Sequence, residues 1–171
     1  MTKKGKILGP HTAAQLGLSE NHIFVDTNVL VGGYSGKSSF QKDADCLHYL
    51  FSLKGKKLYI STLSVAQLIS MFQKGGVRET NECLVEGNQH TNEEIVGMVR
   101  DLQHRFTVID FTNRDINAAL VETGADIEDN VQYVLAKKQK CRIVITNNYK
   151  DYRALQGIQV FRPTEVRRLP R

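Results

Sequence analysis

The strongest constraint on the fold of this chain is a short apolar run that ends in an aspartate, within the segment HIFVDTNVL at residues 22–30. An apolar run of this length, bounded by polar residues, is typical of a strand that is buried on both faces, as in a parallel sheet. Asp26 then lies at the carboxyl end of the strand, where open α/β sheets bind their ligands. Asp26 is therefore the leading candidate site residue, although capping of the following helix is an equally ordinary role for an aspartate here.

The rest of the chain alternates between strand-like and helix-like patterns. Short apolar runs predict further strands at residues 58–60, 107–109, 142–146 and 158–161. Between them, apolar residues at helical spacing predict helices that begin near residues 40, 62, 92, 113 and 126. This alternation predicts an α/β fold with a central parallel sheet of four to five strands flanked by helices.

Some connecting segments carry weaker predictions. Gly32, Gly33 and Gly36 predict a flexible loop beside the acid that ends the first strand. Residues 77–91 are polar and give no clear pattern. Near the C-terminus, Pro163 suits the first turn of a terminal helix.

The 171 residues are enough for one domain with a real core. Residues 1–21 contain several helix breakers and no clean period, so we expect an irregular extension before a domain over residues 22–171. No apolar run approaches the ~18 residues of a membrane span, and the N-terminus lacks a hydrophobic signal-peptide region. Basic residues near the two ends account for the net charge of +5, which fits either polyanion binding or solvated tails.

The cysteines exclude two classes of small scaffold. Cys46, Cys83 and Cys141 are dispersed and odd in number, and no CxxC pair exists. Neither a disulfide framework nor a zinc cluster is supported by such spacing. Reduced thiols in a cytoplasmic protein are the simplest interpretation.

Acidic and amide residues gather in two further segments. Asp126-Ile127-Glu128-Asp129 opens a predicted helix, on which Asp126 and Asp129 share a face and Glu128 is expected to point elsewhere. The segment TNNYKD at residues 146–151 follows a predicted buried strand. Carboxylates that converge on one crevice repel each other, and a hard divalent cation such as Mg²⁺ removes that cost. The alternative is structural, with Asp126 as a helix N-cap and Asp129 favoured by the helix dipole.

Segments from across the chain together resemble the PIN domain family, most of all bacterial PIN proteins of the toxin–antitoxin type. The resemblance covers roughly residues 22–169 and rests on IFVDTNVL, YISTLSVAQLISMFQK, DIEDNVQYVLAKKQKCRIVITNNYKDY and GIQVFRPTEV. It implies a three-layer PIN-like fold with a central parallel sheet flanked by helices. It also implies a ribonuclease that uses Mg²⁺ or Mn²⁺ to hydrolyse RNA phosphodiester bonds, with RNA and an antitoxin protein as partners.

The resemblance also implies roles for single residues. The first acid of the family falls on Asp26. Its acid at the helix start falls on Asp129, with Asp126 beside it. Its last acidic position falls near Asn148 and Asp151. The expected catalytic acids are Asp26, Asp126, Asp129 and Asp151, and the expected metal ligands are Asp26, Asp126 and Asp129. The side chains expected to position substrate or water are Asn28, Thr146, Asn148 and Gln67.

One position departs from the family pattern. The second acid of the family is usually a glutamate on the helix after the second strand, and Gln67 stands in its place. An amide carries no charge and cannot act as a base. The loss weakens the expected metal site unless Glu128 or Asp151 compensates. The alternative function is therefore a degenerate PIN module that binds RNA or a protein partner without cleavage.

Other enzyme classes fit less well, and one assembly is expected. A phosphatase of the haloacid dehalogenase type needs a second aspartate two residues after the first, where this chain has Asn28. A dinucleotide fold needs GxGxxG after the first strand, and none is present. Apolar residues on the helices over 40–53 and 62–74 exceed what one small sheet covers, which predicts a two-fold symmetric homodimer.

Overall fold

The computed structural model describes residues 17–79, 83–86, 90–122, 124 and 126–170. Most of the extension predicted over residues 1–21 therefore lies outside the described residues. The strands are β1 (Ser19–Val25), β2 (Lys57–Ser61), β3 (Gly76–Glu79), β4 (Cys83–Glu86), β5 (Thr107–Ile109), β6 (Cys141–Ile145) and β7 (Gln159–Phe161). The α-helices are α2 (Thr27–Tyr34), α3 (Gln41–Ser52), α4 (Thr62–Gln73), α5 (Asn92–Arg105), α6 (Asn113–Ala119), α7 (Ile127–Lys138) and α8 (Tyr149–Tyr152). The 3₁₀ turns are η1 (Ser38–Phe40) and η2 (Pro163–Arg168).

The central sheet orders its strands β5-β2-β1-β6-β7, and every pairing within it is parallel. Its register aligns the carboxyl ends of the strands: Val25 pairs with Ile145, Ile145 with Phe161, and Ser61 with Ile109. The prediction of a parallel sheet is confirmed. Because the strand ends align, the residues that directly follow them gather at one edge of the sheet.

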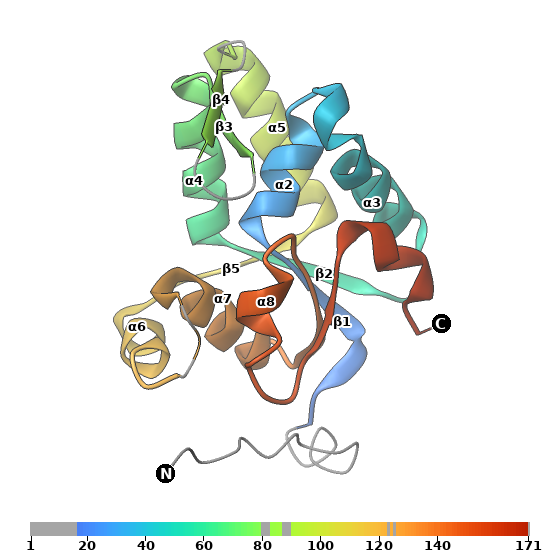
Figure 1. Cartoon of the computed structure of the whole chain (residues 1–171), viewed down its shortest axis with the longest axis vertical. Helices are drawn as coiled ribbons and strands as arrows, with labels where there is room; N and C mark the ends of the chain where they lie inside the picture. Colours follow the sequence, from blue (N-terminus) through green and yellow to red (C-terminus); the bar gives the residue numbers. More distant parts are fainter. Residues whose placement is uncertain (1–16, 80–82, 87–89, 123, 125, 171) are drawn as a thin grey trace.

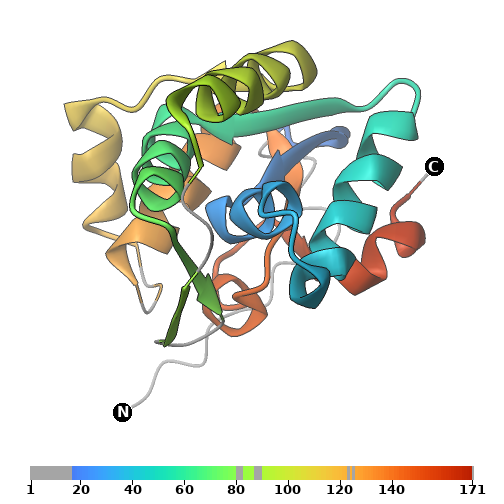
Figure 2. The same cartoon turned by 90° about the horizontal axis from the view of Figure 1, so that it is seen from above.

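Alternate residues of the sheet face two separate apolar layers, as expected for strands with a side-chain period of two. Ile23 and Val25 pack with residues of α2 to α5, whereas Phe24 packs with residues of α7 and α8. Figure 1 shows the two helix layers, with α2 to α5 above the sheet and α6 to α8 below it. In Figure 2, η2 lies beside α3, where Val166 and Leu169 complete the first layer. The fold is the predicted three-layer α/β arrangement.

The flexible loop predicted at Gly32, Gly33 and Gly36 is wrong, because the first two glycines lie in α2. They mark the contact between α2 and α3, where a Cβ atom at Gly32 would collide with Asp43 and one at Gly33 with Leu47. Here the missing side chains permit two helices to approach closely. The chain therefore continues from the end of β1 directly into a closely packed helix pair.

The other elements differ from the sequence prediction in detail. Residues 77–91, which gave no pattern, contribute to the antiparallel hairpin of β3 and β4. α6 ends at Ala119, and Leu120, which follows it, is 58% exposed. The turn that begins at Pro163 is a 3₁₀ turn instead of an α-helix. None of the helices in the described part of the chain is long and apolar enough to cross a membrane.

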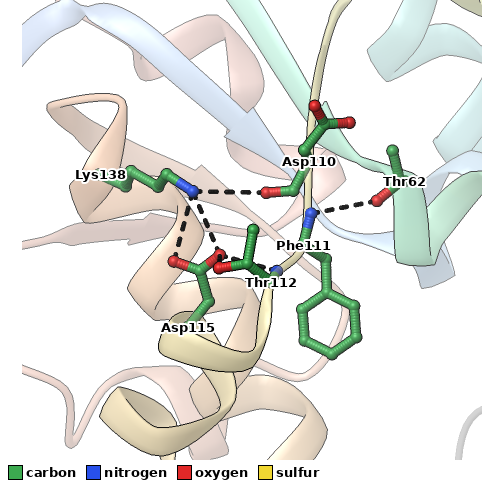
Figure 3. Close-up of polar contacts among 6 residues, drawn as sticks. All are labelled: Thr62, Asp110, Phe111, Thr112, Asp115 and Lys138. Atoms are coloured by element: carbon green, nitrogen blue, oxygen red, sulfur yellow. Dashed lines mark hydrogen bonds and ion pairs between the residues drawn. The ribbon is translucent and has the colours of Figure 1, made fainter.

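A polar cluster fastens α6 to α7 (Figure 3). Asp115, the third residue of α6, is 5% exposed and accepts hydrogen bonds from the Thr112 backbone N–H and hydroxyl at 2.9 and 2.7 Å. Lys138, at the end of α7, donates to the same carboxylate at 3.1 Å and to the Asp110 carbonyl at 3.4 Å. Burial acts to raise the pKa of Asp115, but the Thr112 and Lys138 hydrogen bonds outweigh it and hold this pKa below its usual value. The chain neutralises this buried carboxylate with its own donors.

Candidate active site

Side chains that follow neighbouring strands gather at the carboxyl edge of the sheet. Asp26 follows β1, Thr146 follows β6, and Thr62 opens α4 directly after β2. The first turn of α7 reaches the same place, since the charge of Asp26 acts on Asp129. This is the edge at which open α/β sheets bind their ligands.

Asp26 is almost completely buried, with 4% of its surface exposed, and both of its oxygens accept hydrogen bonds. Oδ1 accepts from the Thr27 backbone N–H at 2.7 Å, which makes Asp26 the N-cap of α2. Oδ2 accepts from the Thr146 hydroxyl and the Asn28 amide, both at 2.7 Å. Burial raises the pKa of Asp26 to about 6 in spite of these donors. A carboxylate offers about four acceptor positions, so one on Oδ1 stays open beside the helix-capping bond.

A chain of amide hydrogen bonds runs from Asp26 to α3. Asn28 Oδ1 accepts from the Asn147 backbone N–H at 3.0 Å, and Asn147 Nδ2 donates to Asp43 Oδ1 at 3.0 Å. Asp43 is completely buried, and this burial raises its pKa. Its Oδ2 has no hydrogen-bond partner among the described residues and lies against Gly32. The sequence interpretation missed Asp43 and Asn147. The signal for Asp43 was an acid on the apolar side of a predicted helix, and that for Asn147 was its place in the segment TNNYKD after a predicted strand.

The first turn of α7 contributes two acids. Asp126 is the N-cap, and its Oδ1 accepts from the Glu128 backbone N–H at 2.7 Å. Asp129 is the third residue of the helix and is 6% exposed, and its Oδ2 has no hydrogen-bond partner within the described chain. Burial raises the pKa of Asp129 to about 8, and nearby carboxylates, led by Asp26, add to the effect. Asp129 is thus a buried aspartate with one oxygen outside any hydrogen bond of ordinary geometry, and it lies among like charges.

The segment after β6 contributes one backbone N–H and two more side chains. The Asn148 backbone N–H donates to Thr146 Oγ1 at 2.9 Å, and Asp151 acts on Asp129 through its charge. Tyr152, which the sequence did not single out, is completely buried. Its hydroxyl interacts with Asp129 but forms no hydrogen bond of ordinary geometry. Burial, and then the negative charges of the site, raise the pKa of Tyr152 well above its usual value.

Gln67 reaches the site from α4. Its Oε1 accepts from the Thr27 hydroxyl at 3.0 Å, and its Nε2 donates to Glu128 Oε1 at 2.7 Å. The expectation that Glu128 points elsewhere is therefore wrong, because Gln67 on a neighbouring helix holds it and its charge acts on Asp26 and Asp129. The spacing of residues within one helix could not reveal a partner on another helix.

The acidic side chains of this site carry oxygen atoms, which are the ligand atoms that hard divalent cations prefer. Within the described part of the chain, no three acidic, histidine or cysteine side chains already form a cluster of metal-ligand dimensions. The buried Oδ2 of Asp129 nevertheless has no partner, and carboxylate oxygens are the ligands that Mg²⁺ and Mn²⁺ prefer. Like charges keep carboxylates apart unless a cation lies between them. The assignment of Asp26, Asp126 and Asp129 as ligands of such an ion stays a prediction.

A comparison with protein families matches residues 22–150 to the PIN domain. The chain belongs to the PIN domain family. The match includes Asp26, Gln67 and the first turn of α7, so the departure at position 67 lies within the matched PIN domain. A search of curated proteins found no match.

Solved structures share the PIN fold at low sequence identity. A toxin–antitoxin complex from Klebsiella pneumoniae has a TM-score of 0.56 and 17% identity, covering 82% of this chain and 97% of that chain. VapBC2 from Rickettsia felis, bound to a promoter DNA fragment, has a TM-score of 0.54 and 16% identity, covering 82% and 98%. VapC20 from Mycobacterium tuberculosis, a toxin that cleaves the sarcin–ricin loop, has a TM-score of 0.52 and 14% identity, covering 75% and 92%. At such identities the likeness supports the PIN fold.

Proposed function

We propose that this PIN domain is a metal-dependent ribonuclease that hydrolyses RNA phosphodiester bonds. The observation that carries the proposal is Asp129, whose buried Oδ2 lacks a partner while neighbouring carboxylates surround it. Burying an unpaired carboxylate among like charges costs stability. A cation that binds there offsets this cost, and hard divalent cations are the ions that enzymes use to cleave phosphodiesters.

The proposed roles follow from the contacts. Asp26, Asp126 and Asp129 would hold Mg²⁺ or Mn²⁺, with Asp151 as a further acid. When bound, the ion supplies an activated water and neutralises charge that develops on the phosphate. The remaining polar residues would position the acids, the substrate or the water. Asn28 and Thr146 bond to Asp26, the Asn148 backbone N–H bonds to Thr146, and Gln67 bonds to Thr27.

We further propose that the chain is the toxin of a toxin–antitoxin pair and acts in the cytoplasm. Support comes from the likeness to toxin–antitoxin complexes and to a toxin that cleaves an RNA loop. Induced expression in a bacterial host should arrest growth, and Asp26→Ala should abolish the arrest. Co-expression with the product of a neighbouring reading frame tests for an antitoxin, which should co-purify and restore growth.

A two-fold symmetric homodimer remains a separate proposal. The apolar residues of α3 and α4 that motivated it are largely covered by the chain itself: Leu47, Leu50, Leu68 and Phe72. Other large apolar side chains are exposed in the described chain, at Val96, Leu120, Val121 and Ile127. Light scattering across a wide concentration range decides the question, and a monomer throughout contradicts the dimer.

Cleavage of a fluorescent single-stranded RNA tests the main proposal. The native protein should cleave in Mg²⁺ or Mn²⁺ and stop in EDTA, and Asp26→Ala should lower the rate by about a hundredfold or more. Asp110→Asn is the matched control, because Asp110 is an exposed acid just after β5, at the same edge of the sheet but two strands away from β1.

The same experiment separates the second candidate function, a PIN module that binds RNA or a protein without cleavage. Gln67 favours this candidate, because it removes a charge where the PIN family usually has one. If the native protein cleaves no RNA in either metal, while Asp26→Ala leaves RNA or partner affinity unchanged, the ribonuclease proposal is wrong.

A further inference from the structure

Gln67 connects two helices at the acidic edge of the sheet. It accepts a hydrogen bond from the Thr27 hydroxyl and donates one to Glu128. A glutamate at position 67 could not make the second bond, because two ionised carboxylates have no proton to share. The amide therefore permits a contact with an acid of α7 that the usual residue of the family would repel.

The orientation of the Gln67 amide agrees with a count of protons in the buried layer beneath it. The Ser61 hydroxyl donates to Gln132 Oε1 at 2.8 Å. Gln132 Nε2 directs its two protons to Thr27 at 3.1 Å and Ser64 at 3.2 Å. The Ser64 hydroxyl lies 2.8 Å from Thr27 Oγ1 and 3.0 Å from Ser61 Oγ, and it has one proton for the two. With that proton on Thr27, Thr27 accepts two hydrogen bonds and donates its own proton to Gln67 Oε1.

The orientation of the Gln67 amide determines which group faces Glu128. With Oε1 of Gln67 turned toward Thr27, the amide NH₂ faces Glu128, which accepts at 2.7 Å as an ionised carboxylate. The other oxygen of Glu128 has no hydrogen bond to any described residue, and the Glu128 charge acts on both Asp26 and Asp129. Glu128 is therefore held at the site by one oxygen, with its second oxygen open.

An independent observation points to a ligand at the same place. Neither Asp129 Oδ2 nor the Tyr152 hydroxyl has a hydrogen bond of ordinary geometry within the described chain, although the two side chains interact, and their residues are 6% and 0% exposed. Buried polar atoms are almost always hydrogen-bonded, so two orphan atoms on interacting side chains require an explanation. A cation bound by Asp129 supplies one for the carboxylate oxygen.

We infer that Glu128 supplies the metal-binding carboxylate that position 67 lacks, and that Gln67 is the positioning residue that holds Glu128 toward the cation. This inference rests on the proposed metal-dependent function. The chain thereby carries on α7 the charge that other PIN domains carry on α4. In this inference the proposed metal site keeps its number of acidic side chains, and one of them comes from a different helix.

Calorimetric titration of metal-free protein with Mn²⁺ tests the inference. The variants are Glu128→Gln, Gln67→Glu and the double variant that exchanges the two side chains. The double variant can keep both hydrogen bonds, because the new carboxylate at position 67 accepts from Thr27 and from the new amide at position 128. Glu93→Gln is the control, since Glu93 is an exposed acid in the first turn of another helix, α5. Thermal unfolding without metal shows whether each variant is folded.

Glu128→Gln should weaken Mn²⁺ binding by about tenfold or more, and the double variant should recover affinity to within about threefold of the native protein. Gln67→Glu alone places two carboxylates in contact, so it should lower the melting temperature without metal and bind Mn²⁺ more tightly than the native protein. Removing only the positioning amide, in Gln67→Met, should cost less affinity than Glu128→Gln.

The outcomes separate this inference from the proposed function. If Glu128→Gln and the native protein bind Mn²⁺ equally well while Asp129→Asn does not, the inference is overturned and the metal-dependent function stands. If the native protein binds neither Mn²⁺ nor Mg²⁺, both are overturned. Loss of affinity in Glu128→Gln without recovery in the exchanged variant also contradicts the inference, because it shows that the two positions do not serve the same ion.

Discussion

Asp115 and Asp129 occupy the same position, the third residue, in two helices that pack against each other, α6 and α7. They are almost equally buried, at 5% and 6% exposure. Asp115 accepts from Thr112 and Lys138, which hold its pKa below the usual value. Asp129 has an oxygen without any partner in the described chain, and burial and neighbouring acids raise its pKa to about 8. The two aspartates thus have almost the same burial and the same helix position, but their pKa values shift in opposite directions.

The difference teaches that burial alone does not mark a functional acid. The same chain neutralises one buried carboxylate with a lysine and a capping box, and leaves the other without a counter-charge. A buried carboxylate without a counter-charge costs stability, and groups with such perturbed pKa values cluster at functional sites. The comparison therefore supports a structural role for Asp115 and the proposed metal-binding role for Asp129, and experiment can contradict either role.

The largest expected effect is on cleavage. Asp129→Asn removes the charge of the unpartnered acid, so the rate of metal-dependent RNA cleavage should fall by about a hundredfold or more. Asp115→Asn is the matched change in the neighbouring helix and should keep the rate within about threefold once the variant is folded. Rates from a fluorescent RNA substrate measure both, and equal losses in the two variants would remove the distinction between the acids.

A lysine introduced near Asp129 should give this carboxylate a positively charged neighbour, as Lys138 does for Asp115. Asp151→Lys replaces a negative charge that acts on Asp129 with a positive one. Mn²⁺ affinity should fall on the order of tenfold, while the metal-free protein should become more stable. Calorimetry and thermal unfolding in EDTA give the two values, with Asp110→Lys as the control. Unchanged Mn²⁺ affinity would show that Asp151 is too distant from the ion to matter.

The complementary change removes the Asp115 carboxylate together with its contacts. Asp115→Ala loses the capping box with Thr112 and the pair with Lys138, whose side chain is 42% exposed. The free energy of unfolding should fall by about 1–2 kcal/mol, because capping contributes most of this and a half-exposed ion pair contributes little. Urea denaturation measures the change. Asp129→Ala, measured without metal, should instead leave stability unchanged or raise it.

The smallest effect concerns pH. The folded-state pKa of Asp129, about 8, lies above the usual 3.8 of an unfolded aspartate. The folded state therefore binds the proton more tightly, and this contribution to stability is complete below pH 4 and is lost as the pH rises toward 8. The native protein in EDTA should lose stability on the order of 1 kcal/mol between pH 6 and pH 8, after discount for solvent screening.

Asp129→Asn should remove this slope, because the amide does not titrate. Asp26, with a pKa of about 6, adds a similar slope only at lower pH. Asp115 acts with the opposite sign, since its pKa is lowered: its contribution is present above the unfolded pKa and is lost only in acid. Urea denaturation midpoints at several pH values in EDTA measure this dependence of stability on pH. If Asp129→Asn keeps the same dependence, another titrating group is responsible.

The sequence predicted the sheet and the position of Asp26 because both depend on local patterns. A buried strand is a continuous apolar run, and the residue after it lies at the sheet edge whatever the neighbouring helices do. The sequence also predicted Asp126 and Asp129 at the start of one helix, where the structure has them as its N-cap and third residue. Their role as metal ligands stays a prediction.

What the sequence could not predict depends on contacts between distant segments. Gly32 and Gly33 suggest a loop unless Asp43 and Leu47 of the next helix are known to lie against them. Glu128 was expected to point elsewhere, because a single helix contains no information about Gln67, which lies 61 residues earlier in the chain. The lack of a partner for Asp129 Oδ2 is visible only when the whole surrounding fold is in place.

The pairing of β1 with β6 has a consequence for synthesis of the protein. Thr146, the donor that holds Asp26, lies 120 residues later in the chain, and parallel strands close such long loops slowly. A growing chain that has released only its first hundred residues from the ribosome contains Asp26 but none of α7 or β6. A chain that ends before β6 therefore cannot carry the assembled acidic edge. The proposed RNA cleavage begins only after β6 has left the ribosome and docked, which gives the proposed binding partner, when it is made at the same time, an interval in which to meet the chain.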